Sequence, residues 1–464
     1  MRRYFIIFFI AITYGSPANS QNVIIKGKVD SSYFAQASTI YAYTYEDYIS
    51  YKEKELARSK LDQEGNFNLT FPSSAATYIF LMVDNAKGEL VAEPGKTYEI
   101  NFLAKDSDAV TTLSIPTPVE LEFLNSGKTE LNALMANFSD SYESFLEDHR
   151  GMIAKKETAV YGKIDTMRTN GLKIFSSYNN PYLTNFIEYT FASLEDNIAL
   201  QGDEKIFKKY IEGKKIQPEN YDYMHFFNQY YSKVASGMMS NPATQAEIEK
   251  QDFSSLMNYF KQNKFLANDT LCEMVVLKSL ASSRIYKNIK INSVLAILEQ
   301  AGRQCKTETD KRTALNLKKK LSVMNIGKPA PSLAFLDMNG KTVALSNFKG
   351  KYIYLNFWAS WCTSCEQEMS LIPELKKMYG SKIAFVSISV DKNIDAMKNF
   401  VKKNPKLDWI FLYCDDYKKA KEEFNVLTVP TYYLIDPKGN VFRSPADRPQ
   451  DIEPTFTRIK KKQQ

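Results

Sequence analysis

The spacing of apolar residues divides the chain into three stretches. In the first stretch, short runs that alternate between apolar and polar residues are separated by turn residues, a pattern typical of β-strands. The runs cover residues 23–29, 39–45, 67–71, 78–83 and 97–102. We therefore predict an all-β sandwich over residues 21–112. We expect the alternating Tyr41, Tyr43 and Tyr45 to pair across strands, and a binding face is the alternative.

In the second stretch, apolar residues recur every three to four positions, which predicts helices. Pro181, Pro218 and Pro242 interrupt this pattern and mark boundaries between helices. We assign an all-α domain of about six to nine helices to residues 113–324, after an extended linker over residues 111–118. Its Tyr and Phe residues are expected to pack between helices. A docking surface for a partner or a dimer contact remains the alternative.

In the third stretch, strand and helix patterns alternate. Residues 352–358 form an apolar run without a period of two, which indicates a central strand buried on both faces. Asn339-Gly340 predicts a hairpin before this strand, and Pro373 is expected to kink the helix after it. Further predicted strands cover residues 383–390, 409–413, 431–436 and 441–443, and helices cover 394–403, 418–424 and the C-terminus. The order predicts an α/β domain over residues 325–464, with a mostly parallel sheet covered on both faces.

The N-terminus has the features of a signal peptide. Arg2 and Arg3 precede an apolar core over residues 4–12, and Ala18-Asn19-Ser20 offers a cleavage site. We assign residues 1–20 to this signal and expect a soluble protein in the periplasm; a buried first strand is the alternative. No cysteine follows the expected cleavage site, so we expect no lipid anchor.

The charge of the chain does not indicate a nucleic-acid partner. The net charge of +7 is the small difference between 60 basic and 53 acidic residues in a chain of 464. The two kinds of residue are mixed along the sequence, which is typical of a solvated surface.

Two of the five cysteines, Cys362 and Cys365, directly follow the predicted central strand. Cys362 is expected at a helix N-terminus, where unpaired backbone N–H groups and the helix dipole favour a thiolate. Cys365 lies one helical turn further and is expected to be more enclosed. This asymmetric pair predicts that Cys362 attacks a disulfide and that Cys365 resolves the mixed disulfide.

These residues resemble the thioredoxin superfamily, and within it the TlpA/ResA-like branch of membrane-anchored or periplasmic thiol-disulfide oxidoreductases. The resemblance covers the chain from about residue 326 onward and rests on three motifs in order. The motifs are residues 326–331 (IGKPAP), 356–362 (NFWASWC) and 428–431 (TVPT). The β-sandwich is similar to small β domains that precede thioredoxin modules in exported proteins of Bacteroidetes-type bacteria.

The resemblance implies roles for further residues. Pro430 matches a cis-proline that faces the two cysteines, which leaves the backbone of Val429 available to pair with an extended substrate peptide. Trp361, Thr363 and Ser364 are expected to contact substrate. A Pro430 that only opens an edge strand is the alternative.

The proton acceptor is expected to differ from that of thioredoxin. Asn356 stands where thioredoxin has a buried acid, and an amide cannot exchange a proton at neutral pH. Glu368 matches a glutamate of ResA-like proteins and lies one turn after Cys365, so it is a candidate acceptor for the Cys365 proton. A solvated glutamate on the helix surface is the alternative.

The other cysteines leave alternatives open. Cys272 and Cys305 form either a disulfide or two buried thiols, and Cys414 is either an accessory thiol or a buried residue. A metal site is not expected, because the two histidines, His149 and His225, lie outside the third stretch. A peroxidase would need a different pattern before its cysteine.

The sequence therefore predicts an exported thiol-disulfide oxidoreductase whose redox centre is the Cys362–Cys365 pair and which needs no other cofactor. The branch implies reduction of disulfides in exported proteins, with cytochrome c maturation as one such process, and a membrane-bound thiol donor of electrons. A disulfide oxidase or isomerase, or a non-catalytic redox-sensing binding protein, is the alternative.

Overall fold

The computed structural model describes residues 20–33, 38–83, 86–103, 117–125, 127–199, 204–282, 289–391, 393–415, 417–426 and 428–462. The predicted signal peptide lies outside the described residues, except for Ser20. Contacts divide the chain into two compact units that meet in sequence at Val234 and Ala235. Among the helices described, none is long and apolar enough to cross a membrane.

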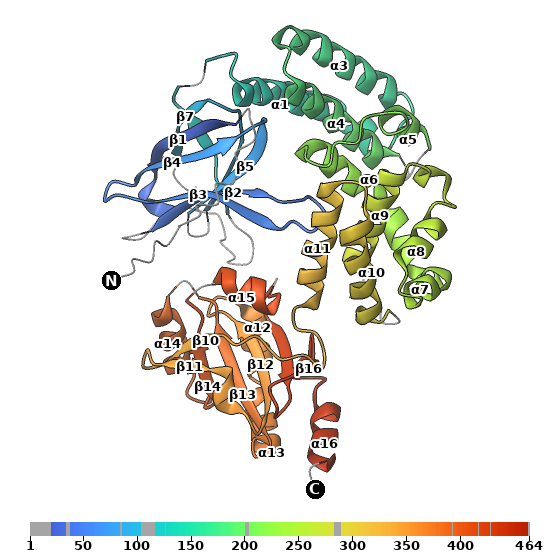
Figure 1. Ribbon diagram of the computed structural model, residues 1–464. Helices are drawn as coiled ribbons and strands as arrows, with labels where there is room; N and C mark the ends of the chain where they lie inside the picture. The colour runs from blue at the N-terminus through green and yellow to red at the C-terminus, as the bar shows by residue number, and fades with distance from the viewer. Residues whose placement is uncertain are drawn as a thin grey trace, which may run out of the picture. The chain divides into compact units, whose positions relative to one another are not determined.

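The first unit begins with two β-sheets, as predicted (Figure 1). The four-stranded sheet has the order β4 (Asn66–Ser73), β1 (Gln21–Val29), β7 (Thr97–Phe102) and β9 (Leu121–Phe123). The five-stranded sheet has the order β3 (Glu53–Lys60), β2 (Thr39–Tyr45), β5 (Thr77–Val83), β6 (Ala86–Ala92) and β8 (Thr117–Pro118). Side chains from both sheets share one core, in which Ile25, Ile79 and Ile100 are fully buried. The sheets therefore form a sandwich.

Four strands were not predicted. The strand β3 is an edge strand whose residues are mostly charged or half-exposed, so it lacks an apolar alternation. The strand β6 contains Gly88 and is short of β-branched residues. Strands β8 and β9 lie within residues assigned to the linker and the helical domain, and they pair with β6 and β7. The β-sheets thus continue past residue 112.

The tyrosines of β2 pack against other aromatic rings. Tyr45 lies opposite Tyr78 on β5, with their rings stacked at 6.4 Å between centroids. Tyr78 in turn stacks at 4.0 Å on Tyr221, which begins α6. The stacking of Tyr45 on Tyr78 confirms the cross-strand interpretation, whereas the contact with α6 was not predicted.

Eleven α-helices follow in the described residues, more than the sequence predicted because several are short. They are α1 (Leu131–Asp148), α2 (Arg150–Ala154), α3 (Val160–Phe175), α4 (Pro181–Ile198), α5 (Glu204–Tyr210), α6 (Tyr221–Ser240), α7 (Pro242–Glu249), α8 (Phe253–Phe260), α9 (Asp269–Ala281), α10 (Ile291–Gln304) and α11 (Glu308–Ser322). Pro181 and Pro242 begin helices, each capped by the preceding asparagine. The division between units falls within α6.

The C-terminal domain has a seven-stranded sheet. The order is β11 (Thr342–Ala344), β10 (Ala334–Asp337), β14 (Ile410–Tyr413), β13 (Ile383–Ser389), β12 (Tyr352–Trp358), β15 (Thr431–Ile435) and β16 (Val441–Arg443). Only β12 with β13 and β13 with β14 are parallel among the described pairs, so the prediction of a mostly parallel sheet was wrong. Two of the four antiparallel pairs are the edge hairpins β10–β11 and β15–β16, and the other two, β10–β14 and β12–β15, join these hairpins to the inner strands. As predicted, β12 is central and its last six residues are buried.

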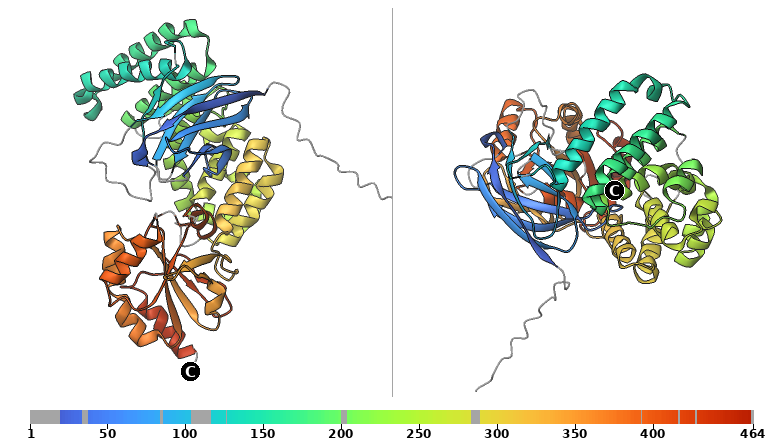
Figure 2. Two further views of the ribbon diagram at one scale, coloured as in Figure 1. Left: turned by 90° about the vertical axis from the view of Figure 1, so that its left-hand side faces the viewer. Right: turned by 90° about the horizontal axis from the view of Figure 1, so that it is seen from above.

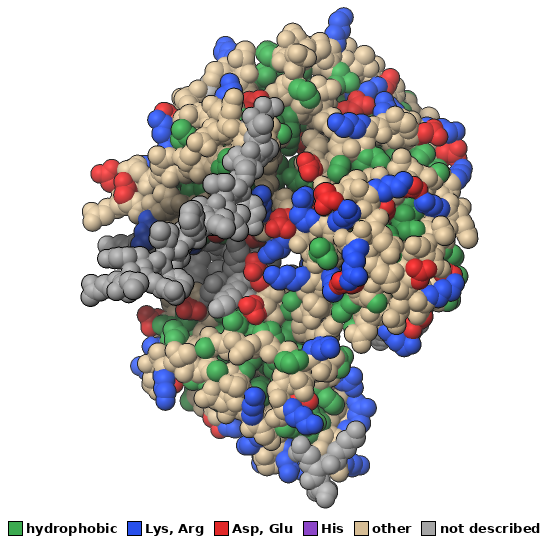
Figure 3. All heavy atoms as spheres, in the orientation of Figure 1, with side chains coloured by type: hydrophobic (Ala, Val, Ile, Leu, Met, Phe, Trp, Pro, Cys, Tyr) green, Lys and Arg blue, Asp and Glu red, His purple; other side chains and the backbone are tan. Residues whose placement is uncertain are grey.

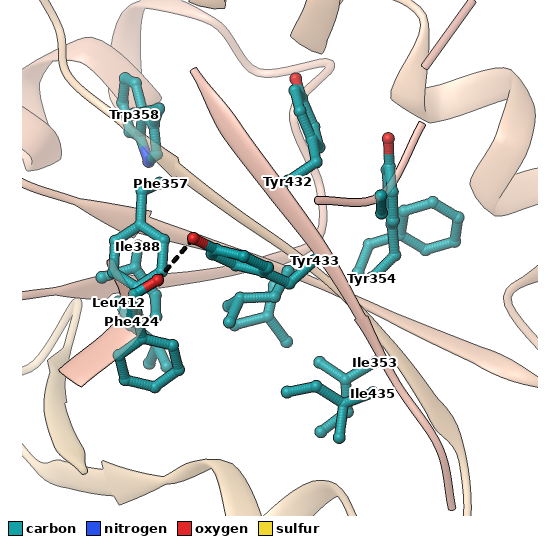
Figure 4. Close-up of a cluster of buried hydrophobic side chains, with 14 of the residues drawn as sticks. Ile353, Tyr354, Phe357, Trp358, Ile388, Leu412, Phe424, Tyr432, Tyr433 and Ile435 are labelled. Atoms are coloured by element: carbon teal, nitrogen blue, oxygen red, sulfur yellow. Dashed lines mark hydrogen bonds between the residues drawn. The ribbon is translucent and has the colours of Figure 1, made fainter. Parts of the chain in front are cut away.

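Helices lie on both faces of this sheet (Figure 2). They are α12 (Thr363–Met369), α13 (Ile372–Tyr379), α14 (Ile394–Lys403), α15 (Tyr417–Phe424) and α16 (Glu453–Lys462). Tyr354 and Trp358 of β12 contact rings of α16 and α14, whereas Phe357 points to the opposite face and contacts Phe424 of α15. Figure 4 shows this core, in which the Tyr433 hydroxyl donates to the Phe424 carbonyl at 2.5 Å.

Charged side chains of both signs are interspersed on the face drawn in Figure 3. Many form ion pairs between exposed groups, as Lys208 does with Glu204 one helical turn away. Such pairs contribute little to stability because water screens them.

Candidate active site

The residues after β12 form a loop that begins helix α12. Trp358 ends the strand with its ring fully buried, between Phe400 and Phe411. Its carbonyl accepts a hydrogen bond from the backbone of Val390 at 2.9 Å, which continues the pairing with the neighbouring strand. The loop that follows Trp358 is therefore anchored at the carboxyl ends of β12 and β13.

Cys362 and Cys365 are joined by a disulfide, with 2.07 Å between the sulfurs. Cys362 is the N-cap residue of α12, and its sulfur accepts a hydrogen bond from the backbone N–H of Cys365 at 3.2 Å. In the reduced protein this N–H group would stabilise a thiolate on Cys362. Cys362 is 8% exposed and Cys365 is fully buried, so the predicted asymmetry between the two sulfurs is present.

The residues between the cysteines are open to solvent. Thr363 and Ser364 are exposed in the first turn of α12, and the Ser364 hydroxyl lies 3.4 Å from the Cys362 sulfur. Trp361 is half-buried beside the domain core. A partner that approaches Cys362 would therefore meet these three side chains first.

The peptide bond between Val429 and Pro430 is cis, as the resemblance implied. Pro430 directly precedes Thr431, which lies opposite Phe357 on the central strand. The proline is thus at the same edge of the sheet as the loop that carries Cys362. Pro430 is buried, whereas Val429 is half-exposed.

Glu368 is buried and does not lie on a solvated helix surface. One of its carboxylate oxygens, Oε1, accepts a hydrogen bond at 2.5 Å from the Arg448 guanidinium. The other, Oε2, is also buried, and the side chain of Tyr432 on β15 lies beside the carboxylate. Glu368 follows Cys365 by three residues, so both lie on one side of α12. The solvated alternative is therefore wrong, and the role in proton transfer stays a prediction.

Pro373 divides the helix as expected. The helix α12 ends at Met369, and α13 begins at Ile372 with Pro373 in its first turn. Because the proline lacks an N–H donor, it is well placed at the start of a helix. Cys362 and Cys365 therefore lie at the N-cap and in the first turn of a helix that is separate from α13.

Asn356 lies under the site within the sheet. Its side-chain oxygen accepts from the Ser387 hydroxyl at 2.6 Å, and this hydroxyl accepts from the Trp409 indole at 2.8 Å. The chain of hydrogen bonds links β12, β13 and the residue before β14 through neutral groups. It contains no ionisable side chain.

Asp391 is a site residue that the sequence analysis missed. It follows β13, is buried, and accepts hydrogen bonds from the backbone N–H and hydroxyl of Ser360 and from the Ser389 hydroxyl. It therefore holds the loop just before Cys362. Its position directly after a buried strand, at the same sheet edge as Cys362, was the available signal.

The three remaining cysteines form no disulfide. Cys272 in α9 and Cys305 after α10 are buried and not bridged to each other, so the disulfide alternative was wrong. Burial raises the pKa of the Cys272 thiol to about 12 and also raises that of Cys305. Cys414 is buried at the end of β14 and takes no part in a disulfide. Buried thiols of this kind react slowly.

Comparisons with known proteins agree on the C-terminal domain. The model of the AhpC/TSA family matches residues 326–444. The thiol-disulfide oxidoreductase ResA of Bacillus thuringiensis subsp. konkukian is 38% identical over 122 residues, which are 26% of this chain and 69% of that protein. ResA of Bacillus subtilis is 32% identical over 118 residues, 25% of this chain and 65% of that protein.

A solved structure is also similar to this domain. It is the crystal structure of the thioredoxin domain of a thiol-disulfide oxidoreductase from Bacteroides vulgatus, which is 25% identical and covers 29% of this chain and 97% of that chain, with a TM-score of 0.28. The stretch matched by the family model contains Cys362, Cys365 and Pro430. The chain therefore belongs, through its C-terminal domain, to the AhpC/TSA family and is a homologue of the ResA thiol-disulfide oxidoreductases.

Proposed function

We propose that the protein is exported to the periplasm and reduces disulfides of other exported proteins by dithiol exchange. The observation that carries this proposal is the asymmetric sulfur pair: Cys362 caps α12 beside the exposed Thr363 and Ser364, and Cys365 is fully buried behind it. A protein disulfide can therefore meet only the first sulfur. Maturation of cytochrome c is one process in which such reduction is used.

The reaction has two exchange steps. The Cys362 thiolate attacks one sulfur of the substrate disulfide, the substrate S–S bond breaks, and one substrate thiolate leaves. Cys365 then loses its proton to Glu368 and attacks the Cys362 sulfur, which releases the second substrate thiolate and forms the Cys362–Cys365 disulfide. The substrate gains two electrons and the enzyme loses two. A membrane-bound thiol donor would restore the dithiol.

The cis-Pro430 edge offers a place for the substrate backbone. Val429 is half-exposed next to the buried proline, and its backbone can pair with an extended peptide by adding a strand. The half-buried Trp361 borders the same sheet edge and offers an apolar surface to the peptide. Such contacts would hold a substrate disulfide against Cys362.

The test uses the full-length protein and three cysteine variants. Wild type should reduce a protein disulfide in the presence of a chemical thiol donor, and Cys362→Ala should abolish turnover. Cys365→Ser should accumulate mixed disulfides with exported proteins when produced in the periplasm, and Cys414→Ser should behave as wild type. A redox-sensing binding protein would instead show no turnover in the wild type.

The reduction potential decides the direction of electron flow. Proteins of this fold range from about −270 mV for reductants to about −120 mV for strong oxidants. A value near the low end would support the proposed reductase, and a value near the high end would assign the protein as an oxidase. Equilibration with glutathione mixtures, read by alkylation of Cys362, gives this value.

A further inference from the structure

The C-terminal domain carries the excess charge of the chain. Basic and acidic residues balance over residues 1–324, so the net charge of +7 comes from residues 325–464. Exposed carboxylates lie in the first turns of helices at the carboxyl ends of the strands, as Glu366 does in α12 and Asp395 in α14. Lysines gather at the opposite end of the sheet. Figure 3 shows Lys and Arg side chains at the lower end of this domain, where Figure 1 draws α13 and α16.

The topology of the sheet brings these lysines together. Strands β12 and β13 are parallel, so Lys351 and Lys382, which directly precede them, lie at one edge of the sheet. The turn that contains Lys438 lies at the same edge, because Ile435 at the end of β15 is opposite Ile353. The helices α13 and α14 also end there, since each leads into a strand that begins at this edge. We call this surface the basic end, and its residues are Lys351, Lys377, Lys382, Lys403, Lys438 and Lys460.

The lysines of the basic end keep their positive charge unneutralised. Among the described residues, none of them forms an ion pair with a carboxylate. The Lys460 ammonium donates to the Met378 carbonyl at 3.4 Å and lies 5.7 Å from the centre of the Tyr379 ring. The Lys351 ammonium donates to the Gly380 carbonyl at 3.4 Å. Met378 is 41% exposed and adds an apolar side chain to this basic surface.

Two carboxylates at this end of the sheet have other partners. Asp408 pairs with Lys376 at 2.7 Å. The Asp436 carboxylate accepts the backbone N–H groups of Lys438 at 2.9 Å and Asn440 at 2.8 Å, which fixes the turn between β15 and β16. These carboxylates therefore serve local structure and leave the basic end positive.

Helix stabilisation accounts for only part of the basic end. Lys377 and Lys403 lie in the last turns of α13 and α14, where a cation interacts favourably with the helix dipole. Lys351, Lys382 and Lys438 lie outside helices, so this explanation does not apply to them. Their common position indicates a partner with negative charge.

The kind of residue indicates the kind of partner. Every member of the basic end is a lysine, and protein–protein interfaces are depleted in lysine and enriched in arginine. A lysine ammonium is a mobile point charge without the planar fork of arginine, so it suits an array of phosphates whose positions are not fixed. We propose that the basic end docks on the surface of a membrane that contains anionic phospholipids, with Met378 in contact with the boundary between headgroups and acyl chains.

This docking would orient the active site. Strand β12 has seven residues and spans roughly 20 Å, with the basic end before it and the cysteine loop after it. Cys362 would therefore face away from the membrane, and the carboxylates at its end of the sheet would face water. The proposal concerns a surface remote from the cysteines and does not depend on the proposed dithiol exchange.

The experiment measures sedimentation of the protein with lipid vesicles. One set contains phosphatidylglycerol and phosphatidylcholine in equal amounts, and the other contains phosphatidylcholine alone. The protein begins at residue 21, because the apolar core over residues 4–12 would itself bind lipid. We expect binding to the anionic vesicles at low salt, release at high salt because ions screen the charges, and no binding to phosphatidylcholine alone.

A triple variant tests the basic end directly. It combines Lys377→Gln, Lys382→Gln and Lys438→Gln. Each lysine close to an anionic surface contributes about fivefold to the affinity, so we expect the triple variant to bind the anionic vesicles about a hundredfold more weakly than wild type. Its rate of disulfide reduction should equal that of wild type, which also shows that the variant is folded.

Two controls separate local charge from other effects. A second triple variant, Lys155→Gln, Lys163→Gln and Lys173→Gln, removes the same charge from exposed positions in the helical region and should bind within about threefold of wild type. Cys362→Ala should bind the vesicles as wild type does, because docking does not involve the sulfurs. In reduced wild type, alkylation of Cys362 should proceed equally fast with and without anionic vesicles.

Several outcomes would overturn the proposal. One is equal affinity of the two triple variants for anionic vesicles, which would assign the binding to net charge alone. Another is retention of wild type on immobilised polyglutamate without binding to vesicles, which would assign an acidic protein as the partner. Slower alkylation of Cys362 on vesicles would contradict the orientation. Binding to vesicles by a wild type that reduces no disulfide would instead refute the proposed function and leave the docking surface supported.

Discussion

Replacing Asp391 with alanine should remove the hydrogen bonds that hold the loop before Cys362 in place. The Asp391 carboxylate accepts hydrogen bonds from the backbone N–H of Ser360 at 3.0 Å, from the Ser360 hydroxyl at 2.8 Å and from the Ser389 hydroxyl at 2.6 Å. The change removes all three. Each lost hydrogen bond to a charged acceptor lowers stability by about 1.5–3 kcal/mol when its partner stays buried. Ser360 is half-buried, so water can satisfy part of the loss. We expect the free energy of unfolding to fall by about 2–4 kcal/mol.

The tryptophans allow this domain to be followed in the full-length chain. All three, Trp358, Trp361 and Trp409, lie in the C-terminal domain. Urea unfolding monitored by tryptophan fluorescence therefore reports on it selectively. With a slope of about 2 kcal/mol per molar urea, the midpoint should fall by about 1–2 M.

Matched variants define what would refute this reasoning. Asp391→Asn keeps one carbonyl oxygen and should lie between wild type and Asp391→Ala. Asp395→Ala removes an exposed carboxylate nearby and should change the free energy of unfolding by about 0.5 kcal/mol or less. If Asp391→Ala and Asp395→Ala have the same midpoint, the three hydrogen bonds do not hold the loop.

Three other predictions concern the rest of the chain. Burial raises the pKa of Asp222 to about 7, so the folded state binds more protons than the unfolded state between about pH 4 and 7, and stability should fall with rising pH there by up to about 1.4 kcal/mol per unit. Asp222→Asn should abolish this dependence in urea unfolding followed by circular dichroism. Gly27→Ala should destabilise the β-sandwich by about 2–3 kcal/mol in the same assay, since a Cβ would lie 1.6 Å from the Ile100 carbonyl oxygen. Cys272 and Cys305 should react with a thiol reagent only on unfolding, and rapid labelling of the native, reduced protein at both would contradict their burial.

Local patterns predicted the parts of the site that are close in sequence. The apolar run of β12, the helix that starts after Cys362 and the proline in α13 all follow from short-range rules. The cis form of Pro430 was predicted from resemblance. The edge strand β3 was missed because its mostly charged side chains do not alternate with apolar ones.

The site residues that the sequence analysis missed are distant in sequence from the residues that they contact. Arg448 is 80 residues from Glu368, and Asp391 is 31 residues from Ser360. Each becomes a partner only through the order of strands in the sheet, which the sequence predicted incompletely. Asp391 had one local signal, its position directly after a buried strand, whereas Arg448 in the loop before α16 had none.

The neutral hydrogen-bond chain from Asn356 through Ser387 to Trp409 has a consequence for how the domain exchanges protons with water. An amide, a hydroxyl and an indole form hydrogen bonds but do not gain or lose a proton near neutral pH. The hydrogen-bond chain through the middle of the sheet therefore holds no group that takes up or releases a proton near neutral pH. The carboxylates described near the cysteines instead lie to the side of this chain, where Asp391 binds Ser360 and Glu368 binds Arg448.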